Sequence, residues 1–340
     1  MRSFLDPRRR AAIGILGAFV TGVLLTLALL RFGPEPLTAR PEPVARTAVV
    51  APAAVATAAP AEVAPDPDAD PWPADAPTPE QVFTAQPDAV RRAVSRLSPR
   101  VPGKPNVYAV AFAGDGSEDV FRNEAEYLDT LMAQRFGSAG HTLVLENNPA
   151  TLGTRPLASW TNLEEGLAGL ARVMDPREDI LLLYVATHGG DDHSLLVDMD
   201  PIPLDQLDPD GLADILQKHA FSWKVLVVNA CYSGGFVPKL RGPGTLVLTS
   251  AREDRTSFGC GADADITYFG RAWLAQGLNA TPDFVEAFGQ ARSAIAGWEK
   301  RESLEPSEPQ IDIGAGIEDK LAAWRKGALV GPAVPFKAAR

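Results

Sequence analysis

The sequence is poor in the side chains from which disulfide frameworks and metal sites are built. Its 340 residues include two cysteines, Cys231 and Cys260, and four histidines. The cysteines form no CxxC pair, and the histidines show none of the close spacings typical of metal ligands. We therefore expect neither a disulfide scaffold nor a metal site, and the sequence indicates no cofactor.

Positive charge is also scarce. Lysine and arginine together number 32, against 43 aspartates and glutamates, which gives a formal net charge of −11. A protein that binds nucleic acid needs clustered lysine and arginine to neutralise phosphates. The charge balance therefore excludes a nucleic-acid partner, and it otherwise indicates little beyond solubility.

A cluster of arginines does occur near the amino terminus. Arg8, Arg9 and Arg10 precede residues 11–30, which carry no charge and are long enough to cross a bilayer. A cleaved signal peptide would have a shorter apolar region, of about 7 to 15 residues. We expect a basic cytoplasmic segment at 1–10 and a transmembrane anchor at 11–30. The protein would then be a single-pass protein of the inner (cell) membrane, with its remainder facing the periplasm or exterior.

Proline, alanine and acidic residues dominate the next segment. Residues 31–87 offer too little apolar surface to offset the entropy lost on ordering, so we expect a disordered, flexible linker. A lead-in helix is predicted at 88–105, and residues 106–326 suit one α/β domain. A tail at 327–340 follows.

Five apolar runs predict the strands of this domain. They lie at 107–113, 141–145, 180–187, 225–230 and 245–250. The third and fourth are continuous and rich in leucine and β-branched residues, as expected of strands buried on both faces of a parallel sheet. A polar loop at 114–117 follows the first run, and 193–198 is consistent with a short hairpin strand.

Helical patterns alternate with these strands. Leu128, Leu131 and Met132 share one helical face after the first strand, and Thr161 with Glu164 has the pattern of a capping box. Further helices are predicted around 212–216, 265–276 and 282–300. Such alternation implies an α/β fold, with a mainly parallel sheet and helices on both faces.

Two of the strands end in reactive side chains. His188 and two glycines follow one, and Cys231-Tyr232-Ser233-Gly234-Gly235 follows the other. Because functional residues of parallel α/β sheets gather at the carboxyl ends of the strands, we expect the imidazole and the thiol on one rim. There the imidazole can take the thiol proton and leave a nucleophilic thiolate. Either residue alone fits a turn or core role, but the pair favours a cysteine hydrolase.

Another histidine lies close by in the sequence. His193 is a rival for the role of base. We prefer His188 because it ends the buried strand, whereas Asp191-Asp192-His193 has the composition of an exposed turn.

The two strand-end motifs resemble those of a known enzyme family. Thr187-His188-Gly189 and Asn229-Ala230-Cys231-Tyr232-Ser233-Gly234 are similar to the motifs of the legumain-like cysteine peptidases, family C13 of the caspase-like clan. That family includes asparaginyl endopeptidases and the catalytic subunit of the GPI transamidase, and the resemblance covers about 106–318. It implies a caspase-like three-layer α/β/α sandwich.

The resemblance also implies catalytic roles. Cys231 would be the nucleophile and His188 the general base and acid, while the backbone N–H groups of Gly189 and Cys231 would form the oxyanion hole. No third, acidic member is required. A bond between Cys231 and Cys260 would block the nucleophile, so we expect both thiols to stay unbonded and Cys260 to be structural.

The substrate pocket departs from the family pattern. Phe121-Arg122-Asn123-Glu124-Ala125 is similar to the family's Tyr-Arg-His-Gln-Ala run, which would place Arg122 opposite an Asn or Asp side chain of the substrate; a solvated helix arginine fits equally well. Asn229 stands where the family has an acid, and the family's other pocket acid would fall near Arg271. These changes would favour an acidic P1 residue.

Two serines complete the predicted pocket. Residues 249–260 resemble the family's loop after the next strand, where a serine lines the pocket. Ser257 is the stronger candidate for this serine, and Ser250 is a less favoured wall. The expected activity is an endopeptidase that cleaves protein or peptide substrates after Asn or Asp through a thioester on Cys231. A transpeptidase or transamidase with the same dyad and a non-catalytic caspase-like scaffold are the alternatives. The sequence gives no indication of the oligomeric state.

Overall fold

The computed structural model describes residues 72–339. The predicted basic segment at 1–10, the anchor at 11–30 and the greater part of the linker lie outside these residues. Within 72–339, the structure contains no helix that is both long and apolar enough to cross a membrane.

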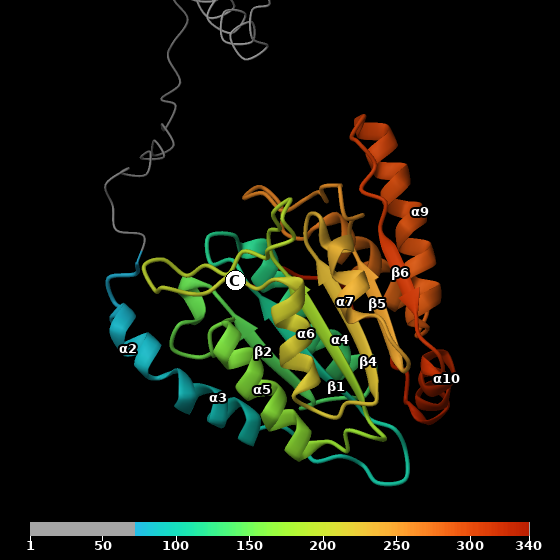
Figure 1. The fold of residues 1–340 in the computed structure, drawn as a ribbon, viewed down its shortest axis with the longest axis horizontal. Helices are drawn as coiled ribbons and strands as arrows, with labels where there is room; N and C mark the ends of the chain where they lie inside the picture. Colours follow the sequence, from blue (N-terminus) through green and yellow to red (C-terminus); the bar gives the residue numbers. More distant parts are fainter. Residues whose placement is uncertain (1–71, 340) are drawn as a thin grey trace, which may run out of the picture. The chain divides into compact units, whose positions relative to one another are not determined.

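A six-stranded sheet with the order β2-β1-β3-β4-β5-β6 forms the centre of the described region (Figure 1). The strands are β1 (Val107–Ala113), β2 (Thr142–Glu146), β3 (Ile180–Ala186), β4 (Trp223–Asn229), β5 (Thr245–Thr249) and β6 (Gln310–Ile313). The first five run parallel, and β6 pairs antiparallel with β5. The predicted α/β class and the mainly parallel sheet are confirmed.

Helices cover both faces of the sheet. Successive residues of β3 enter different cores: Leu182 and Tyr184 lie in one, Leu181 and Leu183 in the other. One face is covered by α4 (Asp119–Gln134), the π-helix η3 (Gly270–Gly277), α9 (Phe284–Glu302) and α10 (Ile317–Gly327). The other is covered by α5 (Trp160–Val173), α6 (Pro209–Gln217) and α7 (Val237–Leu240). Because both faces are covered, the central strands carry apolar side chains throughout.

The helical lead-in begins earlier than predicted. Helices α2 (Pro79–Thr84) and α3 (Gln86–Ser95) replace the last part of the expected linker and the first part of the expected helix at 88–105. Thr78 and Gln81 form a reciprocal capping box at the start of α2. A proline in the first turn of each helix is compatible with this, because no helical hydrogen bond is lost there.

Two helix starts also differ from the sequence-based prediction. Ser159, not Thr161, caps α5, because its hydroxyl accepts a hydrogen bond from the Asn162 N–H at 3.2 Å. The helix expected at 265–276 begins after Thr267 and is a π-helix from Gly270 onward. A Cβ atom at Gly270 would lie 2.2 Å from the Glu124 carboxylate, so the first turn packs directly on that buried acid.

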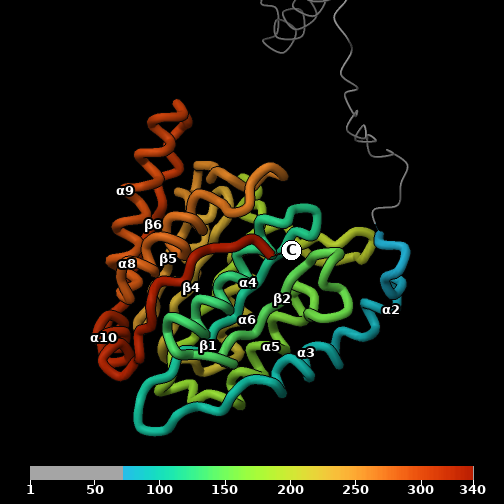
Figure 2. The backbone as a smooth tube through the Cα atoms, turned by 180° about the vertical axis from the view of Figure 1, so that it is seen from behind, coloured from blue at the N-terminus to red at the C-terminus, as the bar shows by residue number. Residues whose placement is uncertain are grey.

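The remaining helical segments are η1 (Pro149–Thr151), η2 (Ser233–Phe236) and α8 (Leu278–Ala280). β6 and α10 were not predicted from the sequence, and neither was the path of the residues after α10. That carboxyl-terminal segment runs along α4 (Figure 2). It is held by hydrogen bonds from Arg135 to Gly331 O, from Tyr127 to Val334 O and from the Ala339 N–H to Asn123 Oδ1, of 2.8, 2.7 and 2.9 Å.

Candidate active site

The ends of β3 and β4 approach each other through their backbones. The strands pair in register up to Ala186 and Asn229, and the Thr187 N–H donates to Asn229 O at 3.2 Å. A Cβ atom on Gly189 would lie 2.2 Å from Cys231 O, so no larger residue fits there without moving the chain. The structure therefore brings the histidine motif and the cysteine motif together on one rim of the sheet.

Cys231 stands on a sharp turn between β4 and η2. Tyr232, the next residue, has φ of 56°, a left-handed conformation that costs a non-glycine residue roughly 1–2 kcal/mol. The Tyr232 N–H donates to Arg255 O at 2.7 Å, and Tyr232 O accepts from the Gly235 N–H at 3.1 Å. These contacts fix the turn, and backbone strain of this kind is concentrated at functional sites.

Two backbone N–H groups near the turn have no acceptor among the described residues. Gly189 occupies the non-hydrogen-bonded position of its bridge to Leu195, because the flanking bonds run from Gly190 N to Ser194 O and from Leu196 N to His188 O. Neither the Gly189 N–H nor the Cys231 N–H donates to any other described residue. Both are the donors that the sequence predicted for an oxyanion hole.

The surroundings of the Cys231 thiol favour its ionised form. A hydrogen bond from the Cys260 side chain, the Ser257 N–H and hydroxyl, and the charge of His188 lower the pKa of Cys231 to about 6, against the opposing effect of burial. The Ser257 N–H lies 3.3 Å from Cys231 Sγ. A thiol with such a pKa is largely thiolate at neutral pH and is a nucleophile there.

Cys260 is a closer neighbour of the nucleophile than the sequence suggested. Both cysteines are free thiols. The hydrogen bond with Cys231, followed by burial, raises the pKa of Cys260. The Cys260 side chain also packs against the core on the α4 face of the sheet.

His188 lies between an aromatic ring and a buried acid. Its imidazole meets Phe121 edge to face, with the ring centroids 5.1 Å apart. Its Nε2 atom is 3.5 Å from Asp115 Oδ2, and the exposed fractions of the two side chains are 35% and 2%. Cys231 Sγ hydrogen-bonds Ser257 and not His188 in the described structure, and such contacts are often loose before substrate binds.

Asp115 was missed as a site residue. It belongs to the loop after β1, where the sequence indicated only a polar turn. One signal was available: β1 is parallel to β3 and β4, so the residues after it share the rim with His188 and Cys231.

His193 also lies at the site, although the sequence placed it on an exposed turn. Its Nδ1 atom is 3.1 Å from Tyr232 O, and a Cβ atom on Gly235 would lie 2.3 Å from its ring. His193 has a left-handed backbone, with φ of 66°. The side chain thus packs on the turn after the nucleophile, with one ring nitrogen engaged by that turn.

The predicted pocket residues differ in where they lie. Ser257 contacts the thiol, as described. Ser250 and Asn229 are each 1% exposed and point into the protein. Ser250 Oγ donates to Ala230 O at 2.9 Å, and Asn229 Nδ2 donates to Glu124 Oε2 and Thr267 Oγ1 at 2.8 and 2.9 Å. Both side chains stabilise the end of β4 from inside the protein, and neither lines an opening at the surface.

A buried acid that the sequence did not single out organises this lower layer. Glu124 is fully buried and accepts hydrogen bonds from Tyr184, Asn229 and the Thr267 N–H. Burial raises the pKa of Glu124, and these donors act in the opposite direction. The available signal was its place on the apolar face of α4, between Phe121 and Leu128.

Arg122 and Arg271, which the sequence places near the predicted substrate pocket, have different contacts in the structure. Arg122 is buried, and its guanidinium donates to Asn148 Oδ1 at 3.1 Å and to Ala339 O at 3.0 Å. Arg271 stacks over the Trp298 ring at 4.8 Å. Among the described residues, neither arginine has a hydrogen bond or ion pair with Cys231 or Ser257.

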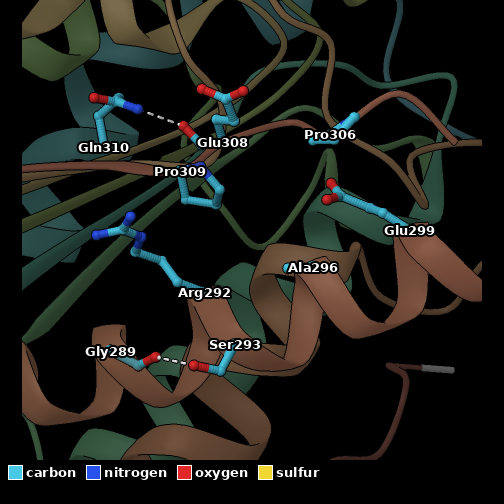
Figure 3. Close-up of a pocket in the computed structure, with 9 residues that line it drawn as sticks. All are labelled: Gly289, Arg292, Ser293, Ala296, Glu299, Pro306, Glu308, Pro309 and Gln310. Atoms are coloured by element: carbon cyan, nitrogen blue, oxygen red, sulfur yellow. Dashed lines mark hydrogen bonds between the residues drawn. The ribbon is translucent and has the colours of Figure 1, made fainter.

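A separate pocket of about 520 Å³ lies between α9 and the segment before β6 (Figure 3). Arg292, Ser293 and Glu299 line it from α9, and Glu308 and Gln310 from the other side. Glu308 forms an ion pair with Arg252 of the loop after β5. None of the predicted site residues lines this pocket, and we assign it no catalytic role.

Comparison with known protein families supports the resemblance inferred from the two strand-end motifs. Residues 161–319 match the model of the Peptidase C13 family. The match includes both strand-end motifs and leaves out β1 and α4, and with them Arg122. No curated protein matches the chain.

Proposed function

We propose that the protein is a cysteine endopeptidase in which Cys231 is the nucleophile and His188 the general base and acid. The premise is the match of residues 161–319 to the model of the Peptidase C13 family. One observation carries the proposal. Gly189 packs against the Cys231 backbone, neither of their N–H groups donates to another described residue, and the pKa of the Cys231 thiol is lowered to about 6. A nucleophile and preset donors for a developing oxyanion are the two components that acyl transfer requires.

The proposed reaction has two halves. The Cys231 thiolate attacks the carbonyl carbon of the scissile peptide, and the Gly189 and Cys231 N–H groups stabilise the oxyanion. His188 gives a proton to the leaving amine, which departs and leaves a thioester on Cys231. In the second half His188 takes a proton from water, the hydroxide attacks the thioester, and the thiolate is released.

We propose cleavage after Asn or Asp on the strength of the family resemblance. Ser257, which contacts the thiol, is the predicted pocket residue best placed to meet a P1 side chain. Arg122 enters the pocket only if its bonds to Asn148 and Ala339 are broken.

The test is labelling and cleavage by the full chain in detergent under reducing conditions. A peptidyl electrophile with Asn at P1 should modify Cys231, and the Cys231→Ala variant should take no label. Peptides that differ only in Asn, Asp or Lys at P1 should be cleaved in the first two cases, and an added amine reports transpeptidation as a ligated product. Failure to label or cleave would favour a non-catalytic scaffold, and preference for Lys would contradict the proposed specificity.

We also propose that residues 11–30 anchor the protein in the membrane with the peptidase domain on the periplasmic or outer side. Support comes from the uncharged run preceded by Arg8, Arg9 and Arg10. Extraction with carbonate should leave the protein in the membrane fraction, and protease added to intact spheroplasts should digest the domain. Protection from that protease would contradict the orientation.

A further inference from the structure

The two donors of the predicted oxyanion hole come from separate parts of the chain. The Gly189 N–H belongs to the loop 188–198, which follows β3, and the Cys231 N–H to the turn 231–235, which follows β4. Preset donors stabilise an oxyanion only while the distance between them is fixed. A hydrogen bond between the loop and the turn would therefore help to fix the hole.

His193 supplies such a hydrogen bond. Its Nδ1 atom lies 3.1 Å from Tyr232 O, and no other hydrogen bond among the described residues joins the loop to the turn. Because a carbonyl oxygen only accepts hydrogen bonds, Nδ1 must carry a proton. The imidazole thus donates to the residue that directly follows the nucleophile.

The His193 ring also packs directly on the turn. A Cβ atom on Gly235 would lie 2.3 Å from Cγ of the ring and 2.5 Å from both Cδ2 and Nδ1. No side chain fits at such distances, so the ring can lie there only because residue 235 is glycine. The Gly235 backbone itself does not require glycine, because its φ is not positive. The last glycine of the cysteine motif is therefore explained by the ring of His193.

Both residues of this hydrogen bond have a left-handed backbone. The φ angle is 66° at His193 and 56° at Tyr232, a conformation that few non-glycine residues adopt. In the loop, the His193 N–H donates to Gly190 O at 2.9 Å, and the Gly190 N–H donates to Ser194 O at 2.8 Å. In the turn, the Tyr232 N–H donates to Arg255 O. Strain of this kind persists only where the surrounding structure fixes it, and it is concentrated at functional sites.

We propose that His193 is a positioning residue, which holds the turn 231–235 against the loop 188–198 and so keeps the two oxyanion donors at a fixed spacing. The inference rests on the proposed function. The role differs from that of His188, because the His193 imidazole exchanges no proton with the thiol or the leaving group and acts through the backbone of Tyr232. Nδ1 is a donor in both the neutral and the protonated ring, so the role does not depend on the charge of the imidazole.

The experiment uses the full chain in detergent and compares substitutions of His193. His193→Ala removes the donor, and we expect kcat to fall about fivefold, the equivalent of one net hydrogen bond, with KM within about twofold. His193→Gly relieves the left-handed backbone without supplying a donor and should lose as much. His193→Asn should stay within about twofold of wild type, because its Nδ2 replaces Nδ1 and asparagine tolerates a positive φ.

The control is His219→Ala, which removes the imidazole after α6, whose ring meets Phe221. It should stay within about twofold of wild type. Full activity in His193→Gly would show that backbone strain and not the hydrogen bond matters, and would overturn the inference. Equal losses in His193→Asn and His193→Ala would overturn it as well.

A second comparison separates positioning from a general loss of structure. Peptide cleavage needs the oxyanion hole, whereas alkylation of Cys231 by iodoacetamide forms no oxyanion. We therefore expect His193→Ala to be alkylated at a rate within about twofold of wild type while it cleaves the peptide about fivefold more slowly. Equal losses in the two reactions would contradict the positioning role.

Gly235→Ala tests the same contact from the side of the turn. The added methyl group must displace the His193 ring. We expect a loss similar to that of His193→Ala, and a double variant no less active than the weaker single variant, because both changes remove one interaction. Losses that multiply in the double variant would indicate two independent effects and would refute the inference.

One readout does not depend on turnover. Nitrogen-15 NMR of the His193 ring should show the neutral imidazole protonated at Nδ1 in the wild type, and Gly235→Ala should lose that preference. Protonation at Nε2 in the wild type would overturn the inference. If the wild type neither cleaves peptides nor takes a label at Cys231, the proposed function fails, while the NMR measurement still decides whether His193 holds the turn.

Discussion

Asn229 and Cys231 lie at the end of β4 in opposite environments: one is buried and the other is partly exposed. Asn229 is 1% exposed, and its amide is satisfied by Glu124, Thr267 and Tyr184. Cys231 is partly exposed, and its backbone N–H has no partner among the described residues. We refer to Asn229, Glu124, Thr267 and Tyr184 as the floor, and to Cys231, Gly189 and His188 as the rim.

The difference shows how one strand end serves two purposes. A buried polar network whose members are all hydrogen-bonded has a single arrangement, and it fixes the strand that enters it. Donors left unpaired near the surface remain available to a substrate without first breaking an internal bond. The floor therefore sets position, and the rim supplies reactivity.

The largest expected effect concerns the rim. His188→Ala should lower kcat/KM by about 100- to 10,000-fold, because the general base is lost. The matched variant is His193→Ala, whose imidazole is engaged by Tyr232 O and which should lose less than about tenfold. Steady-state kinetics on one peptide decides the matter, and survival of activity without His188 would contradict the mechanism.

Substitutions in the floor should lower the free energy of unfolding more than they lower the activity. Glu124→Ala leaves Tyr184, Asn229 and the Thr267 N–H without their acceptor, and we expect a loss of about 3 kcal/mol in the free energy of unfolding. Glu124→Gln, which keeps an acceptor, should lose less. The control is Glu165→Ala on the exposed side of α5, expected within about 0.5 kcal/mol. Urea unfolding measures all three, and a loss equal to that control would erase the distinction between floor and rim.

The smallest effect is a shift in pH dependence at the thiol. Since the pKa of Cys231 is lowered to about 6, its alkylation by iodoacetamide should accelerate as the pH rises through 6 and level off above it. Cys260→Ala removes the first cause of the lowering, so the midpoint should move upward. Mass spectrometry of the labelled peptide separates the two cysteines, and a wild-type midpoint near the ordinary value of about 8.5 would contradict the environment described for the rim.

Sequence reasoning succeeded where local pattern decides the structure. The runs at 180–187 and 225–230 became β3 and β4 almost residue for residue, because a strand covered on both faces has to be apolar throughout. The parallel arrangement then located His188 and Cys231 on one rim. Both results need only periodicity and topology.

The rest depended on contacts between distant segments. Asp115 and Glu124 look like ordinary loop and helix acids, and only tertiary packing buries them beside His188 and Asn229. The direction of Arg122 is set by Asn148 and Ala339, which no local pattern connects to it. β6 is short and carries polar Gln310 and Asp312, so its pairing with β5 leaves little signal in the sequence.

The segment along α4 has a consequence for the order of folding during synthesis. The bond from Arg122 to Ala339 O joins residues 217 positions apart, and the bond from Tyr127 to Val334 O joins residues 207 apart. The first bond requires synthesis of the chain to residue 339 and the second to residue 334, long after α4 has been made. A nascent chain that ends with α10 would have the nucleophile and its base but would lack these contacts on α4, so the segment after α10 docks last.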